Sequence, residues 1–149
     1  MRLPTVDDTR RFGSHLARYL EPGDLVVLTG PLGAGKTAMA QGIGTGLGVK
    51  GTIVSPTFVI ARVHPGAIPL VHVDAYRLGS IVEVDDLDLD ATQDESVTVV
   101  EWGRGLVERL ADSFLEIHID RLDDDTRVVK LEPHGDSWAE RLASAGFGN

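Results

Sequence analysis

One octapeptide limits the possible folds of this chain more than any other feature of its sequence. Residues 30–37 read Gly-Pro-Leu-Gly-Ala-Gly-Lys-Thr and match the phosphate-loop pattern G-x-x-x-x-G-K-[ST] in full. An apolar run at 24–29 precedes the loop and predicts a buried strand, and a helix-length segment through Met39, Ile43 and Leu47 follows it. A glycine-rich turn that binds nothing would not need this context, so we predict a nucleotide-binding loop.

Each residue type in the loop has a chemical reason to be there. Glycines adopt backbone angles that let successive N–H groups face phosphate oxygens, and the loop leads into a helix N-terminus that favours anions. We expect Lys36 to reach the β- and γ-phosphates and the hydroxyl of Thr37 to ligate magnesium. The residues of this segment predicted to contact ATP are Gly30, Leu32, Gly33, Ala34, Gly35, Lys36, Thr37 and Ala38.

Length and composition narrow the class of protein further. The 149 residues, 42% of them hydrophobic, suit a single domain over 1–149. No stretch approaches the roughly 20 apolar residues of a membrane span, and the first residues lack a secretory signal, so we expect a cytoplasmic protein. The absence of cysteine excludes disulfides, Cys-ligated zinc and a thiol nucleophile.

The charge argues against direct, tight binding of RNA or DNA. The formal net charge is −9, and of only three lysines one belongs to the nucleotide loop. Nucleic-acid binders usually carry clustered Lys and Arg to neutralise phosphates. The negative charge does not exclude binding to a basic partner, or to a partner that itself holds nucleic acid.

The pattern of apolar residues predicts strands alternating with helices. Thr5 and Asp8 fit a capping box that starts a helix with Phe12, Leu16 and Leu20 on one face, ended by Pro22-Gly23. The other expected strands are 58–63, Leu70–Asp74, Val97–Glu101, 114–119 and 127–131, with a turn at 64–66, and further helices are expected at 106–110 and Asp136–Ala145, the last burying Trp138 and Leu142. We therefore predict an α/β layered fold of the P-loop NTPase type, with a mainly parallel central sheet flanked by helices.

Two acidic residues stand at the ends of apolar strands. Asp74 and Glu101 should both emerge at the carboxyl edge of an open α/β sheet, where ligands bind. Either could hold magnesium through water while the other orients the attacking water; alternatively, each only caps a strand or pairs with an arginine such as Arg77. Beside an intact phosphate loop, we favour functional roles for both.

Two neighbouring positions are weaker candidates. Thr57, in the segment Ser-Pro-Thr-Phe at 55–58, could reach the γ-phosphate or the metal as a switch residue, although a plain turn fits equally well. His72 shares a strand face with Asp74, but a lone histidine is more often a packing or hydrogen-bonding residue than a catalyst.

Four segments, in this order, resemble the bacterial TsaE family of small ATPases. They are the loop at 30–37, Ser-Pro-Thr-Phe at 55–58, His-Val-Asp-Ala-Tyr-Arg-Leu at 72–78, and Glu101-Trp102. The resemblance implies a protein that works in making threonylcarbamoyladenosine in tRNA. It further implies ATP binding and hydrolysis while docked on a heterodimer of the transferase TsaD and its partner TsaB, without transfer of the threonylcarbamoyl group, and contact with tRNA only through these partners.

The resemblance also assigns roles to matching positions. It places Lys36 and Thr37 on the phosphates and the metal, and Thr57 in a switch-like loop. It favours Glu101 over Asp74 as the magnesium ligand. Positions expected near the nucleotide in addition are Val6, Thr9 and Arg127.

Three other classes of protein compete with this interpretation. A GTPase would need a guanine-recognition motif of the Asn/Thr-Lys-x-Asp type, and the only asparagine is Asn149. A small-molecule kinase would need an arginine-bearing lid, for which Arg104 and Arg109 are candidates but no insertion is long enough. A binding module regulated by nucleotide would bind ATP and form complexes without stimulated hydrolysis.

Overall fold

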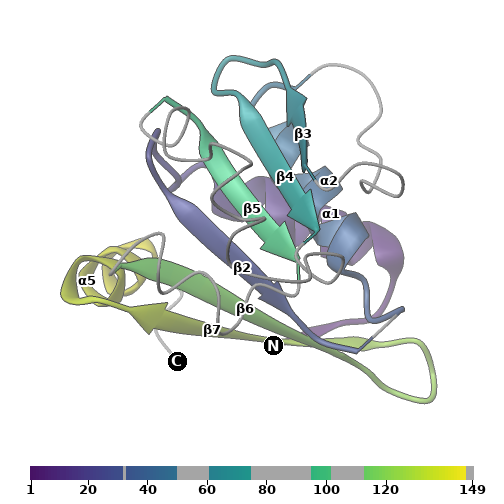
Figure 1. Cartoon of the computed structure of the whole chain (residues 1–149). Helices are drawn as coiled ribbons and strands as arrows, with labels where there is room; N and C mark the ends of the chain where they lie inside the picture. Colours follow the sequence, from purple (N-terminus) through teal and green to yellow (C-terminus); the bar gives the residue numbers. More distant parts are fainter. Residues whose placement is uncertain (32, 50–60, 75–94, 102–112, 147–149) are drawn as a thin grey trace.

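The computed structural model describes residues 1–31, 33–49, 61–74, 95–101 and 113–146 (Figure 1). The strands and helices in these segments are β1 (Arg2–Leu3), α1 (Val6–Ala17), β2 (Leu25–Thr29), α2 (Lys36–Gly46), β3 (Ala61–His64), β4 (Leu70–Asp74), β5 (Val97–Glu101), β6 (Phe114–Arg121), β7 (Arg127–His134) and α5 (Asp136–Ala145). The described strands form one seven-stranded sheet in the order β1-β7-β6-β2-β5-β4-β3.

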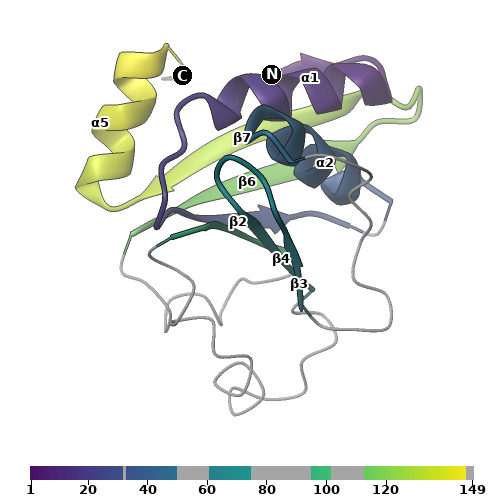
Figure 2. The same cartoon turned by 90° about the horizontal axis from the view of Figure 1, so that it is seen from above.

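The centre of the sheet is parallel and its margins are antiparallel. The strands β6, β2, β5 and β4 run parallel to one another, whereas β7 and β1 on one side and β3 on the other are antiparallel to their neighbours. The helices α1 and α2 cover one face of this sheet (Figure 2). The predicted α/β layered fold is confirmed, with the parallel arrangement confined to the four central strands.

The core lies between the sheet and the two helices α1 and α2. On β6, Leu115, Ile117 and Ile119 alternate toward this core and are fully buried. From the helices, Leu16 and Met39 are also fully buried in it. Burial of apolar surface on this face holds β2 and α2, the two elements that flank the glycine-rich loop, against each other.

Glycines let α1 and α2 approach closely where residues 10–17 of α1 pack against residues 39–46 of α2. A Cβ at Gly42 would overlap the carbonyl oxygen of Arg10, and a Cβ at Gly46 would lie 2.5 Å from the Cβ of Ala17. Since these contacts advance in the same direction along both helices, α1 runs parallel to α2 and its N-terminus lies toward the glycine-rich loop. The glycines weaken α2 by propensity, and this packing compensates for them.

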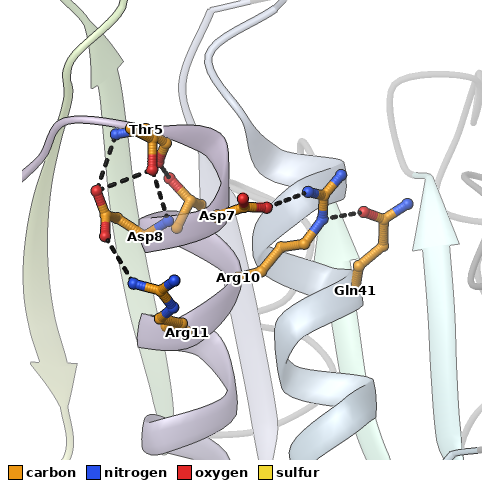
Figure 3. A network of polar contacts seen from close by, with 7 residues as sticks. Thr5, Asp7, Asp8, Arg10, Arg11 and Gln41 are labelled. Atoms are coloured by element: carbon orange, nitrogen blue, oxygen red, sulfur yellow. Dashed lines mark hydrogen bonds and ion pairs between the residues drawn. The ribbon is translucent and has the colours of Figure 1, made fainter.

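The predicted capping box of α1 is present. The Thr5 side chain accepts a hydrogen bond from the Asp8 N–H at 3.1 Å, and the Asp8 carboxylate accepts one from the Thr5 N–H at 3.0 Å (Figure 3). The helix ends earlier than predicted, at Ala17, so placing Leu20 on its apolar face was wrong. Leu20 is nevertheless buried, because its side chain joins the core cluster from the turn that follows the helix.

The C-terminal helix α5 has the bounds predicted for it, and Trp138 and Leu142 are its buried residues. The Arg141 guanidinium lies 4.1 Å from the Trp138 ring centroid and donates to Asp24 Oδ2 at 2.5 Å. Burial raises the pKa of Asp24, although the Arg141 charge opposes this shift. The helix is therefore tied to the segment that enters β2.

Other bounds differ from the prediction because long-range pairing decides them. His64 is the last residue of β3 rather than part of a turn, since it pairs with Leu70 of β4. The hairpin of β6 and β7 is longer than predicted at its ends, and β1 was not predicted at all. The residues of the predicted strand at 58–60 and of the predicted helix at 106–110 lie outside the described segments. None of the described helices combines the length and the apolar character needed to cross a membrane.

Candidate phosphate-binding site

The glycine-rich loop joins the carboxyl end of β2 to the N-terminus of α2, in the middle of the sheet. Gly33 and Gly35 have φ angles of 80° and 111°, which L-residues with a side chain rarely adopt. Gly30 is required for another reason, because a Cβ there would overlap the carbonyl oxygen of Ile119 on β6. Gly33 and Gly35 are therefore needed for their backbone angles, and Gly30 is needed because the loop packs closely against β6. Leu32 lies outside the described residues.

The Lys36 side chain is folded over the loop. Its Nζ donates to the carbonyl oxygens of Gly30 and Pro31, at 2.8 Å in each case, and the residue is only 4% exposed. These bonds fix a positive charge above the loop in a site with little solvent. Electrostatic attraction is stronger there than at the open surface.

The first turn of α2 carries no carboxylate of its own. Gly35, the N-cap, makes no side-chain hydrogen bond to the helix, and the first turn, with Thr37 and Ala38, contains no acidic residue. The first N–H groups of a helix need acceptors, and the dipole favours a negative charge there. A phosphate group from a ligand would meet both needs.

The hairpin of β6 and β7 places two arginines beside the loop. A Cβ at Gly35 would lie 3.2 Å from Nε of Arg127, and a Cβ at Gly33 would lie 3.9 Å from Nη1 of Arg121. Arg127 donates to the Asp125 carbonyl at 2.6 Å, but its buried Nε has no acceptor among the described residues. The expected place of Arg127 near the nucleotide loop is in keeping with this geometry. Arg121 was not among the predicted residues, although it ends the strand that the loop packs on.

Glu101 and Asp74 end neighbouring strands and pair with each other in register. Glu101 also pairs with Leu28 of β2, two residues before the loop begins. Its buried carboxylate oxygen Oε2 lies 2.5 Å from Nε2 of the fully buried His72. The backbones of both predicted acids therefore reach the same edge as the loop, while the Asp74 side chain and the whole of Thr57 lie outside what the structure describes.

His72 is a hydrogen-bonding residue, as its lone occurrence on a strand predicted. Its Nε2 contacts Glu101, and its buried Nδ1 has no partner among the described residues. The imidazole can orient the Glu101 carboxylate, since a hydrogen bond to one oxygen fixes the plane of the group. Sequence analysis missed this contact because it depends on the register of β4 against β5.

Val6 and Thr9 lie in the first turns of α1, at the end of that helix nearer the loop. Val6 is 41% exposed, which is unusual for its size and type. Thr9 is fully buried, and its hydroxyl lies 3.5 Å from the Thr5 carbonyl. Of the two predicted positions, Val6 is the one whose side chain is open to a ligand.

A family model and individual relatives of this chain point to the same protein family. A model of the family described as "Threonylcarbamoyl adenosine biosynthesis protein TsaE" matches residues 3–129. A protein named tRNA threonylcarbamoyladenosine biosynthesis protein TsaE from Streptomyces coelicolor is 54% identical over 138 residues, covering 87% of this chain and 93% of that protein. A protein of the same name from Mycobacterium tuberculosis is 49% identical over 138 residues, covering 85% and 82%.

A solved structure agrees with these relatives. The crystal structure of YdiB from Bacillus subtilis superposes with a TM-score of 0.81 at 30% identity, over 98% of this chain and 92% of that chain. At this identity and coverage, the similarity extends through both the sheet and the helices that flank the loop.

Proposed function

Because this chain belongs to the TsaE family of threonylcarbamoyl adenosine biosynthesis proteins, we propose that it is a magnesium-dependent ATPase whose phosphate site is the loop at 30–37. The observation that carries the proposal is the first turn of α2, which has a glycine cap and no acid of its own. Lys36 and Arg127 add two positive side chains beside it. This is a site arranged for an anion with several charges.

The chain's own residues divide the work of binding and hydrolysis. The Lys36 ammonium exchanges its two carbonyl partners for phosphate oxygens, and Arg127, beside Gly35, neutralises further negative charge. The Thr37 hydroxyl and the Glu101 carboxylate would hold magnesium, which would neutralise part of the negative charge of the phosphates. Asp74, at the same edge of the sheet, orients the water that attacks the γ-phosphate, and Thr57 acts as a switch residue.

Catalysis in this arrangement is positional and electrostatic. The reacting groups are held in line, and the positive charges are fixed in place before the reaction. His72 keeps the Glu101 carboxylate in one orientation through the 2.5 Å contact. A positioned carboxylate needs no reorganisation when the metal arrives.

We further propose that hydrolysis depends on the partners TsaB and TsaD, and that tRNA is reached only through them. The net charge of −9 supports this, because it disfavours direct contact with the phosphates of tRNA. The proposal places the chain in the cytoplasm, where tRNA is modified. The free energy of ATP hydrolysis would be used by the complex with TsaB and TsaD, and this chain itself would not transfer the threonylcarbamoyl group.

The test is magnesium-dependent ATP hydrolysis by the purified chain, alone and with purified TsaB and TsaD. We expect weak activity alone and clear stimulation by the pair. Glu101→Gln should lower stimulated turnover at least tenfold and change ATP affinity far less, while Glu140→Gln, an exposed acid on α5, should change neither. Normal turnover in Glu101→Gln would contradict the role of this carboxylate. ATP-dependent assembly without hydrolysis would favour a nucleotide-regulated binding module, and a phosphorylated small molecule would favour a kinase.

A further inference from the structure

A second cluster of ionisable residues lies on the hairpin of β6 and β7. Glu116 and His118 alternate with core residues on β6, whereas on β7 Glu132 follows Leu131, which packs against the core, and His134 lies two residues further along the strand. Glu116 is directly opposite Glu132 in the ladder, and Phe114 is opposite His134. All four side chains therefore project from the sheet face away from the core of α1 and α2.

The contacts within this cluster are short and converge on one point. The ligand atoms of Glu116, His118 and Glu132 all lie within 4.8 Å of one another. His118 Nε2 is 2.7 Å from Oε2 of Glu132 and 3.5 Å from Oε2 of Glu116. Two ligands of a tetrahedral zinc ion are separated by about 3.3–3.6 Å, given zinc bonds of about 2.0–2.2 Å. The first of these spacings would have to open slightly, and the second already fits.

Glu116 is held in place by two further residues. The Thr29 hydroxyl donates to Glu116 Oε2 at 2.9 Å, and His134 Nε2 lies 3.0 Å from Glu116 Oε1. The residue is only 3% exposed, and Oε2, the oxygen that accepts the Thr29 hydrogen bond, is also the oxygen that faces His118. Partners of this kind orient metal ligands in known sites.

The two carboxylates of Glu116 and Glu132 also favour a bound cation between them. Two carboxylates directly opposite in an antiparallel pair repel each other. Among the described residues, the ion-pair partners within 4 Å of Glu116 and Glu132 are histidines, and exposed Lys130 lies directly opposite His118 in the ladder.

We propose that Glu116, His118 and Glu132 form a binding site for a zinc-like divalent cation, with His134 and Thr29 orienting Glu116. An imidazole with two carboxylates suits zinc, whereas magnesium prefers oxygen ligands alone. Two carboxylates and a neutral imidazole balance the charge of the ion. The site is separate from the nucleotide magnesium, yet Thr29 connects it to the loop because the next residue is Gly30.

The experiment is calorimetric titration of the tag-free, full-length chain with zinc chloride, without nucleotide and with excess magnesium present. We expect saturable binding of one zinc per chain. His118→Ala and Glu132→Gln, both at partly exposed positions, should each weaken it at least tenfold. The matched controls His15→Ala on α1 and Glu140→Gln on α5 should leave it unchanged.

Three results would overturn the proposal. They are the absence of saturable one-to-one binding, equal affinity in His118→Ala and the unaltered chain, and loss of binding in Thr37→Ala. The last would mean that zinc occupies the magnesium position of the nucleotide site. Cobalt substitution gives a second measurement, because a visible absorption band from nitrogen and oxygen ligands should be lost in His118→Ala while circular dichroism shows an intact fold.

Discussion

The N-termini of α1 and α2 lie at the same end of two parallel, neighbouring helices and have opposite chemistry. The first turn of α1 is capped by Thr5 and carries two acids, Asp7 and Asp8. Each acid forms an ion pair with an arginine on the same helix (Figure 3). The first turn of α2 has a glycine cap, no acid, and a lysine held over it. One helix satisfies its end with side chains, and the other leaves that end for a ligand.

This difference shows how the same physical requirement serves stability in one place and binding in another. Every helix leaves N–H groups and a partial positive charge at its start. Where the sequence supplies the acceptor, as at Thr5 and Asp8, the acceptor contributes to folding. Where the sequence withholds it, as at Gly35, the same free energy becomes available to a phosphate group.

The largest expected effect comes from removing the charge at the open end. Lys36→Ala should weaken MgATP binding about 100-fold, because charge-assisted hydrogen bonding to phosphate contributes about 1.5–3 kcal/mol and a 100-fold change corresponds to about 2.7 kcal/mol. Isothermal titration with MgATP measures this. Lys130→Ala, an exposed lysine on β7, is the matched control and should bind ATP normally. Equal affinities in the two variants would contradict the role of the loop.

The next effect comes from forcing the two helices apart. Gly42→Ala would place a Cβ against the Arg10 carbonyl, and backbone on both sides leaves little room to relax. We expect the free energy of unfolding to fall by about 2 kcal/mol, as for overpacked cores. Urea denaturation measures it. Thr45→Ala, on the exposed face of the same helix, should be nearly neutral, and an equally neutral Gly42→Ala would show that the helices are not closely packed.

A smaller effect is expected at the closed end. Thr5→Ala removes the capping box of α1 and should lower the free energy of unfolding by about 1 kcal/mol. ATP affinity should not change, since α1 satisfies its own end. Measuring both quantities on one variant sharpens the comparison with Lys36→Ala, which should show the reverse pattern. A loss of ATP affinity here would mean that the two ends are coupled.

The smallest effect is expected for the link between the helices. Arg10 bonds Gln41 of α2 and Asp7 of its own helix, at 3.1 Å each, but its side chain is largely exposed (Figure 3). Arg10→Ala should change the free energy of unfolding by less than about 0.5 kcal/mol, as exposed pairs usually do. High salt should screen the ion pair, so that Arg10→Ala and the unaltered chain give the same free energy of unfolding in urea denaturation. A change above about 1 kcal/mol would show that the pair is better shielded from solvent than its exposure indicates.

Sequence reasoning succeeded where the signal is local. The capping box of α1 involves residues three apart, and α5 has a compact amphipathic pattern, so both were predicted correctly. The phosphate loop is a continuous motif whose flanking strand and helix are also local. The fold class followed from the alternation of such elements, and the strand at Val97–Glu101 from its apolar run.

It failed where distant strands decide the geometry. The two residues of β1 form a strand only because they pair with Arg127 and Val128. The contact between His72 and Glu101 requires the register of β4 against β5, and the cluster around Glu116 requires the register of β6 against β7. The available signal for this cluster was a Glu-x-His spacing at 116–118, on the strand predicted at 114–119, and a matching one at 132–134, directly after the strand predicted at 127–131.

The central place of β2 has a consequence for how the molecule opens. Both edges of β2 are hydrogen-bonded, to β5 and to β6, and two further described strands lie beyond each of these neighbours. Amide protons on such a strand exchange with solvent only in the rarest openings, whereas marginal strands such as β1 and β3 fray first. The strand that carries the glycine-rich loop should thus be among the last backbone to exchange in deuterium. The strand beneath the proposed phosphate site should therefore stay closed while the marginal strands open and close.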